Sequence, residues 1–243
     1  MEEYIVGRNA VREALRSGRG VQRILIANDA GGGAVQSIVR EAFSAGIEVR
    51  KASDKQLEKY ARGLAHQGVV AMAAQVEFKE LYEVLEESFR LTDAPFLVLV
   101  DGIEDPHNLG AIIRTAECAG ASGILIPKRH AAPVNATVAK TSAGAIHHVP
   151  LVQIGNVAYA IKDLQKAGFW IYGAHMEGDC TIYDADFSGP TVLVVGNEGK
   201  GLSRLTKELC DKLVTIPMYG RLNSLNASVA AALFMYEAIR QRR

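Results

Sequence analysis

Polar residues that could do chemistry gather in three short segments, each of which directly follows a run of apolar residues. The segments are 101–110, 196–201 and 216–228, and each is rich in Gly, Asn or Ser. A polar loop held between two buried elements is typical of a ligand-binding loop. Because turns at the strand ends of one α/β domain meet at one edge of its sheet, the pattern predicts one shared site.

The second segment invites two nucleotide-binding interpretations, and both fail in detail. Gly199 and Gly201 follow an apolar strand, as in a dinucleotide fingerprint, but the third glycine position holds Arg204. Lys200 follows a glycine, yet Gly201 stands where a phosphate-binding loop requires Ser or Thr. The sequence therefore disfavours dehydrogenases and nucleoside triphosphatases.

The first segment leads into an amphipathic helix. Asn108 is predicted to be its N-cap, and Arg114 falls roughly 150° away from the centre of the apolar stripe. The stripe follows helical spacing and consists of Leu109, Ile112, Ile113 and Ala116. On spacing alone, a capping Asn and a solvated surface Arg are the simpler interpretations.

The other polar side chains also have structural alternatives. Glu198 could offset the positive N-terminus of the helix that follows it. Ser224 and Asn226 could be caps of the last helix. Taken singly, none of these residues is diagnostic.

Length and composition are those of an ordinary globular protein. The chain has 243 residues, of which 49% are hydrophobic and 22% charged. No apolar run approaches the roughly 18 residues that a bilayer-spanning helix needs. The first residues resemble no signal peptide, so we expect a cytoplasmic location.

The cysteines and histidines show no ligand spacing, so no metal site is expected. Cys118, Cys180 and Cys210 are odd in number and widely separated, which predicts reduced and mostly buried thiols. His147 and His148 are neighbours, but a strand there would turn their rings to opposite faces.

Lys and Arg together number 27, as do Asp and Glu, so the formal net charge is zero. This balance argues against the simplest picture of a nucleic-acid binder and leaves the task to local basic clusters. One cluster with helix-like spacing consists of Arg8, Arg12, Arg16, Arg19 and Arg23. A solvated helix face explains that spacing equally well.

The order of apolar runs predicts a small N-terminal α/β domain over 1–78, a linker over 79–94 and a larger α/β domain over 95–243. The expected strands are 23–27, 47–50, 68–76, 96–101, 123–127, 148–152, 169–174, 191–196 and 213–217. The expected helices lie near 8–17, 34–45, 53–60, 79–90, 108–119, 135–143, 156–167, 201–211 and 226–240. Near-continuous Val, Ile and Leu strands between helices predict a mainly parallel sheet covered on both faces.

Taken in order, the three segments resemble the sequence motifs of the SpoU-type (TrmH-like) branch of the SPOUT RNA methyltransferases. The motifs are Asp101 to Ala116, Val195 to Leu202, and Ile216 to Ser228. The N-terminal part, with Tyr4, Gly7 and the run His66-Gln67-Gly68-Val69, resembles the substrate-binding domain of certain members. Those members methylate a guanosine ribose of large-subunit (23S) ribosomal RNA.

This resemblance implies features that periodicity does not reveal. It implies a C-terminal trefoil knot in the α/β domain, an N-terminal domain with the ribosomal protein L30e-like fold, and a homodimer whose site is completed across the interface. It also implies S-adenosylmethionine as the cofactor and ribosomal RNA, or a pre-ribosomal particle, as the partner. The implied reaction is 2′-O-methylation of a ribose.

The resemblance further assigns residues to roles. The implied catalytic set is Asn108, Arg114, Glu198, Ser224 and Asn226. The implied cofactor-binding set is Gly196, Ile216, Met218 and Leu225, and the implied RNA-binding set is Arg8, Arg12, His66 and Gln67. Because a guanidinium is essentially always protonated, Arg114 is expected to anchor phosphate and orient the 2′-hydroxyl more than to act as a base.

Three alternatives stay open at this point. The same chemistry could act on transfer RNA, although the N-terminal domain favours ribosomal RNA by analogy. A non-catalytic RNA-binding or ribosome-assembly protein could keep the same fold. An α/β enzyme that uses another nucleotide is the third alternative, and the failed nucleotide motifs weaken it.

Overall fold

The computed structural model describes residues 2–16, 21–74 and 76–242. The chain divides into two compact units. One contains the residues up to 76 together with 133–139, and the other contains 77–132 and the residues from 140 onward.

The first unit is built on a four-stranded sheet in the order β1 (Glu2–Val6), β4 (Val69–Ala74), β2 (Val21–Ala27), β3 (Glu48–Ala52). β4 is antiparallel to both β1 and β2, whereas β2 and β3 are parallel. The sequence analysis missed β1. Its two leading glutamates hide the strand pattern, and charged residues are well tolerated at the edge of a sheet.

Helices cover both faces of this sheet. Ile24 and Ile26 of β2 pack in one cluster with residues of α1 (Arg8–Arg16) and α2 (Gly33–Ser44). Leu25, on the alternate face of the same strand, packs with Leu57 of α3 (Asp54–Ala61). The predicted helices of the N-terminal region are therefore confirmed to within two residues at each end.

The second unit contains an eight-stranded sheet in the order β10-β12-β9-β11-β6-β7-β8-β5. Its strands are β5 (Phe78–Lys79), β6 (Phe96–Asp101), β7 (Gly123–Pro127), β8 (Leu151–Ile154), β9 (Trp170–Ala174), β10 (Cys180–Thr181), β11 (Thr191–Gly196) and β12 (Lys212–Thr215). Every pairing between these described strands is parallel. The prediction of a mainly parallel sheet is confirmed.

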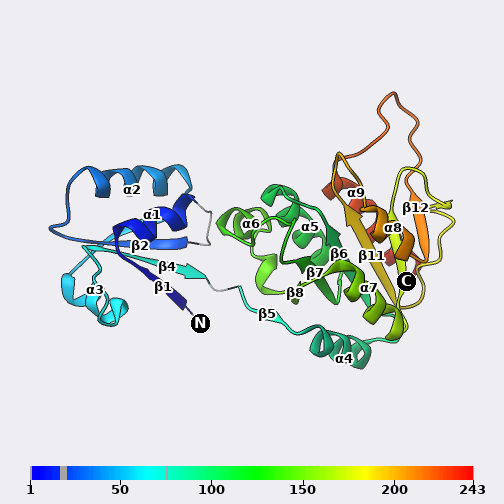
Figure 1. Ribbon diagram of the computed structural model, residues 1–243, viewed down its shortest axis with the longest axis horizontal. Helices are drawn as coiled ribbons and strands as arrows, with labels where there is room; N and C mark the ends of the chain where they lie inside the picture. Colours follow the sequence, from blue (N-terminus) through cyan, green and yellow to red (C-terminus); the bar gives the residue numbers. More distant parts are fainter. Residues whose placement is uncertain (1, 17–20, 75, 243) are drawn as a thin grey trace. The chain divides into compact units, whose positions relative to one another are not determined.

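Helices pack around this sheet, as Figure 1 shows. They are α4 (Leu81–Leu91), α5 (Pro106–Cys118), α7 (Val157–Lys166), α8 (Arg204–Leu209) and α9 (Ala227–Gln241), whereas the residues of α6 (Ala136–Thr141) are divided between the two units. Leu97 and Leu99 of β6 pack in a cluster with residues of α4 and α7. Val98 and Val100 face the other way and are also fully buried, so both faces of β6 are covered.

Two expectations about local structure are wrong, and two short strands were missed. His147 ends a short 3₁₀ helix (Ala145–His147) and β8 begins only at Leu151, so the strand argument for the two histidine rings does not apply. The prediction of mostly buried thiols fails at Cys118, which is exposed at the end of α5. The short strands β5 and β10 were missed because two residues carry no periodicity.

Two features are absent from the described residues. No helix in this part of the chain is long and apolar enough to cross a membrane. No group of three or more His, Cys, Asp and Glu side chains is arranged there to hold a metal ion.

Candidate active site

The three polar segments follow β6, β11 and β12 of the second unit. We call them loop 1 (residues 101–105), loop 2 (197–203) and loop 3 (216–226). β6 and β11 are adjacent and parallel, and β9 lies between β11 and β12. Because all these strands run in one direction, the three loops leave the same edge of the sheet.

Loop 1 ends in a capped helix whose cap differs from the predicted one. Asp105 is the N-cap of α5 and accepts a hydrogen bond from the His107 amide at 2.9 Å, with Pro106 at the first helical position. A proline there needs no amide donor, and Asp is a strong cap, so the N-cap lies three residues before Asn108 and the helix begins at Pro106. The Asn108 side chain is thereby released from capping and lies buried in the first turn, with 8% exposed.

Asn108 instead links three loops. Its Nδ2 donates to Glu198 Oε1 of loop 2 and to Asp105 Oδ2 at 3.3 Å. Asn226 of loop 3 donates from Nδ2 to Asn108 Oδ1 at 3.0 Å and to Glu198 Oε1 at 3.2 Å. We call Asn108, Glu198 and Asn226 the polar triad.

Asn226 has a second role, because it is also the N-cap of α9. Its Oδ1 accepts from the Ser228 amide at 3.0 Å and from the Val229 amide at 3.3 Å. The expectation that Asn226 caps the last helix is therefore correct, although capping is only one of its roles. The same expectation is wrong for Ser224, which does not cap the helix. The amide side chain uses its oxygen for the helix and its nitrogen for the triad.

Loop 2 is a tight turn fixed mainly by Asn197. The Asn197 and Gly201 backbones bond each other at 3.1 and 2.8 Å, and the Asn197 side-chain oxygen accepts from the amides of Gly199 and Lys200. Asn197 Nδ2 donates to the Gly102 carbonyl of loop 1 at 2.9 Å. A Cβ atom on Gly196 would lie 2.5 Å from the Gly201 backbone, so this approach requires glycine.

Loop 1 also anchors the helix that follows loop 2. Asp101 Oδ2 accepts from Thr206 Oγ1 at 2.7 Å and from the Ser203 amide at 3.2 Å. Ser203 is the N-cap of α8, so the helix begins later than predicted. Glu198 is not part of that terminus, and the interpretation that it offsets the dipole of α8 is wrong.

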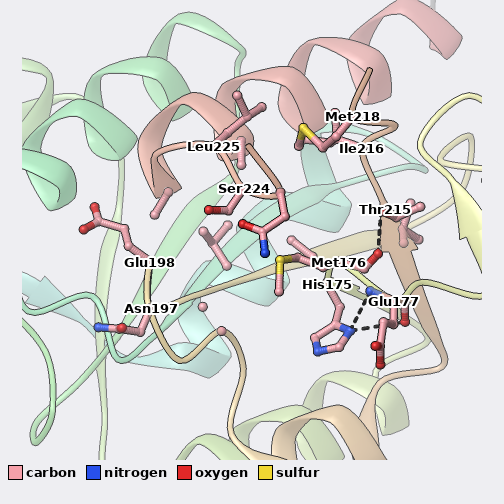
Figure 2. Close-up of a pocket in the computed structure, with 18 of the residues that line it drawn as sticks. His175, Met176, Glu177, Asn197, Glu198, Thr215, Ile216, Met218, Ser224 and Leu225 are labelled. Atoms are coloured by element: carbon pink, nitrogen blue, oxygen red, sulfur yellow. Dashed lines mark hydrogen bonds between the residues drawn. The ribbon is translucent and has the colours of Figure 1, made fainter. Parts of the chain in front are cut away.

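A cavity of about 490 Å³ opens between loops 2 and 3 and the end of β9. Figure 2 shows Ile216, Met218, Ser224 and Leu225 on one side of it and the stretch from His175 to Glu177 on another. Every residue of the predicted cofactor-binding set lines this cavity, as do Glu198 and Ser224. Asn108, Arg114 and Asn226 are not among its lining residues.

Sequence reasoning missed the segment after β9. His175, Met176 and Glu177 line the cavity, and Thr215 Oγ1 donates to the Met176 carbonyl at 3.0 Å, which ties this segment to β12. The segment lacks the Asn-rich and Ser-rich character of the other loops. Its position at the carboxyl end of a parallel strand was the signal that could have revealed it.

Arg114 lies apart from the polar triad, on the exposed side of α5. Within the described residues, no hydrogen bond joins its guanidinium to the triad. The predicted position opposite the apolar stripe is confirmed.

Two of the predicted RNA-binding residues meet in the first unit. Arg8 donates from its backbone amide to Gln67 Oε1 at 3.3 Å and from Nε to the Gln67 carbonyl at 2.8 Å. Gln67 has a positive φ of 50°, and His66 Nδ1 accepts from the Gly68 amide, so the turn before β4 is tightly held.

The other arginines of the sequence cluster have different surroundings. Arg16 pairs with Glu41 at 3.5 Å and Arg23 with Glu48 at 2.6 Å. Among the described residues, Arg12 forms no ion pair. Arg19 lies outside the residues that the structure describes.

Comparison with known protein families identifies the family of this chain. The model of the SpoU rRNA Methylase family matches residues 95–236, which include all three loops. The chain belongs to this family. A second model, described as RNA 2′-O ribose methyltransferase substrate binding, matches residues 4–79.

Curated relatives of this SpoU methylase extend over nearly the whole chain. YacO of Bacillus subtilis, named for the TrmH family of tRNA/rRNA methyltransferases, is 41% identical over 99% of this chain and 96% of its own length. The 23S rRNA (guanosine-2′-O-)-methyltransferase RlmB of Shewanella oneidensis is 44% identical over 85% of this chain and 83% of its own length.

Solved structures of the same family superpose on the whole chain. The SpoU methyltransferase AviRb of Streptomyces viridochromogenes has a TM-score of 0.66 at 28% identity and covers 99% of this chain and 90% of its own. The same protein was also solved in complex with the cofactor AdoMet. The present protein is thus an RNA 2′-O-ribose methyltransferase that uses S-adenosylmethionine.

The residues of the cavity fit that cofactor. Its volume lies within the roughly 300–1,000 Å³ of small-molecule pockets. Apolar side chains such as Ile216, Met218 and Leu225 suit the adenine ring, and the loop backbones around them offer hydrogen-bonding groups. The carboxylates of Glu177 and Glu198 suit the cationic part of the cofactor.

Proposed function

We propose that this SpoU methylase transfers a methyl group to the ribose 2′-hydroxyl of a guanosine in large-subunit (23S) ribosomal RNA. The observation that carries the proposal is the polar triad, which joins loops 1, 2 and 3 and of which Glu198 lines the cavity. The activity for which the relative RlmB is named and the substrate-binding match over 4–79 support the choice of RNA.

The cofactor would be held by Gly196, Ile216, Met218 and Leu225. When bound, it supplies an activated methyl group on a sulfonium. The enzyme must then align the acceptor oxygen with that group and help to remove the hydroxyl proton, and alignment alone can supply most of the acceleration. Rigid loops suit this task, and each of the three loops is tied to another by side-chain hydrogen bonds.

The polar triad would hold the acceptor ribose in place and keep the three loops in fixed positions relative to one another. Asn108 would orient the ribose or the Arg114 side chain, and Glu198 would fix loop 2 through both asparagines. Asn226 and Ser224 would order loop 3, which carries part of the cavity wall.

Arg114 would bind an RNA phosphate and orient the 2′-hydroxyl. Its exposed position on α5 suits contact with a large external substrate, and its planar guanidinium suits bidentate binding of phosphate. We expect Arg114→Ala to lower kcat by roughly 100-fold, in the range reported for loss of one preorganised donor. If Arg114→Lys restored full turnover, planar recognition would not be needed.

The active form would be a cytoplasmic homodimer with a trefoil knot in its second unit. Val229, Leu233 and Tyr236 of α9 are exposed at a spacing of four and three residues, so they form an apolar stripe on one side of the helix. Such a stripe is typical of an interface. Light scattering of the wild type and of Leu233→Asp tests the dimer, which the variant should weaken.

The first unit, with an L30e-like fold, would select the RNA. Arg8, Arg12, His66 and Gln67 would contact the RNA, which proteins recognise mainly by shape and by its single-stranded loops. Transfer RNA is the second candidate substrate, because the name of YacO includes both RNA classes.

Labelled S-adenosylmethionine tests the proposal. Unmodified 23S ribosomal RNA, assembly particles and bulk transfer RNA are offered in parallel, and the ribose-methylated nucleotide is mapped. We expect a single 2′-O-methylguanosine in 23S RNA or in the particle. Methylation confined to transfer RNA would move the assignment to the second candidate.

A further inference from the structure

The structure contains a basic turn beside the active site that the three motifs do not include. Lys128, Arg129 and His130 follow directly after β7, and all three are exposed, whereas every residue of β7 is buried. We call residues 128–130 the basic turn. It leaves the same edge of the parallel sheet as loops 1, 2 and 3, because β7 pairs in parallel with β6.

Backbone hydrogen bonds on both sides fix the position of this turn. The Lys128 amide donates to the Ile154 carbonyl at the end of β8 at 2.8 Å. The Ala132 amide donates to the Ile103 carbonyl of loop 1 at 2.7 Å. Loop 1 is therefore held on one side by Asn197 of loop 2, through the Gly102 carbonyl, and on the other by Ala132, two residues after the basic turn.

His130 has a positive φ. Its φ is +56°, in the left-handed region that few residues other than glycine adopt, although Asn, Asp and His occur there more often than other side chains. Such strain persists only where the surrounding structure imposes it, and it occurs often at ligand-binding sites. The strain here fixes a bend that leaves three basic side chains in solvent.

The charge of the basic turn is not neutralised within the protein. Among the described residues, neither Lys128 nor Arg129 forms an ion pair or a side-chain hydrogen bond. Loop 1 has two exposed acidic residues, Glu104 and Asp105, and Asp105 is bound to the first turn of α5. A protein with zero net charge that binds RNA needs local cations of this kind.

We propose that the basic turn binds the RNA phosphates that flank the target nucleotide, and so places the acceptor ribose at loop 1. This inference rests on the proposed RNA methyl transfer and assigns its substrate a second contact beside Arg114. Lys128 and Arg129 would neutralise phosphates, and His130 would add a hydrogen-bond donor or acceptor. Contacts of this kind position the substrate without reading its bases.

The test compares two double variants that remove the same charge. Lys128→Ala/Arg129→Ala removes two cations from the basic turn. Lys162→Ala/Lys166→Ala removes two exposed cations from α7, which leads away from this edge of the sheet to the start of β9. RNA affinity is measured as a function of salt concentration, and S-adenosylmethionine affinity is measured by calorimetry on the same samples.

We expect the basic-turn variant to bind RNA at least about tenfold more weakly than the α7 variant, with a salt slope smaller by about one to two. Cofactor affinity should stay within about twofold of wild type. The charge-retaining variant Lys128→Arg/Arg129→Lys should keep the wild-type slope. Equal affinity and slope in the two alanine variants would overturn the inference, as would the same loss in the charge-retaining variant.

The outcomes separate this inference from the proposed function. If the wild type transferred methyl groups to no RNA, the proposed function itself would fail. If the wild type were active and the basic-turn variant matched the α7 variant, only the role of the turn would be rejected.

Discussion

The two units of this SpoU methylase use their polar side chains in different ways. In the second unit, Asn108 of the first turn of α5, Glu198 of loop 2 and Asn226 of loop 3 are far apart in the sequence and bond one another. In the first unit, the arginines that share helical spacing do not act together, because Arg16 and Arg23 pair with Glu41 and Glu48. Among the described arginines of the cluster, Arg8, Arg12 and Arg16 lie in α1 but Arg23 lies in β2, so helical spacing did not predict which of these cations form ion pairs.

The difference reflects how each site is assembled. A parallel sheet brings the loops of one edge together whatever their separation in sequence, so distant polar segments converge. A basic helix face has no such constraint, and nearby carboxylates neutralise part of it. RNA binding by the first unit must therefore depend on fewer residues than its arginine count suggests.

The largest expected effect comes from the tight approach in loop 2. In Gly196→Ala the new Cβ atom would lie 2.5 Å from the Gly201 backbone, which cannot move without displacing loop 2. We expect S-adenosylmethionine affinity to fall by at least about 100-fold, with a loss of roughly 1–3 kcal/mol in the free energy of unfolding. Calorimetry and denaturant titration measure both. Gly189→Ala, which has open space around its Cβ position, is the matched control and should behave as wild type.

Asn226 allows the two roles of one side chain to be separated. Asn226→Ala removes the cap of α9 and both triad bonds, and should lower the free energy of unfolding by about 1 kcal/mol and turnover by roughly 100-fold. Asn226→Ser keeps a capping oxygen and lacks the amide nitrogen. It should recover most of the stability and little of the turnover. Recovery of both would show that the cap alone matters.

The first unit offers a smaller effect with an internal control. Arg12 has no carboxylate partner among the described residues, whereas Arg16 is paired with Glu41. We expect Arg12→Ala to weaken RNA binding by roughly tenfold and Arg16→Ala by less than about twofold. Filter binding at fixed salt measures both constants. Equal losses would mean that the whole helix face contacts RNA and that the ion pair opens on binding.

The smallest effect concerns thiol reactivity, which reports on the second unit alone because all three cysteines lie there. Burial, with nearby Asp211 and Asp101, raises the pKa of Cys210 to about 12, so its thiol is protonated at pH 8. Because the thiolate is the reactive form, iodoacetamide should modify exposed Cys118 first and Cys210 at least about tenfold more slowly. Mass spectrometry of a time course measures the order. Rapid modification of Cys210 would show that the packing around α8 is loose.

Sequence patterns predicted the elements that are long and buried. β6, β7 and β11 consist almost wholly of buried apolar residues, and their predicted bounds match the structure. The edge strand β1 and the two-residue strands were missed, because their pairing depends on neighbours that are distant in the sequence.

The sequence predicted which loops form the candidate site, but it did not predict the hydrogen bonds between them. Apolar runs followed by Gly and Asn indicated the three loops, and the family resemblance indicated the residues. Asp105 and Pro106 were a sequence signal for the start of α5, but the bond of Asn108 to Glu198 could not be predicted because the two residues are 90 apart in the sequence. His175 to Glu177 lack polar-loop character, and the basic turn depends on a backbone conformation at His130 that its sequence does not signal.

The measurement that tests this account most directly is a double-mutant cycle on kcat for Asn108→Ala and Glu198→Ala, with saturating cofactor and RNA. If the polar triad acts as one unit, each single variant should lose roughly 100-fold and the double variant about the same, because either change breaks the same connection. Losses that multiply to roughly 10⁴-fold would show that the two side chains act independently and would contradict a site joined by the triad.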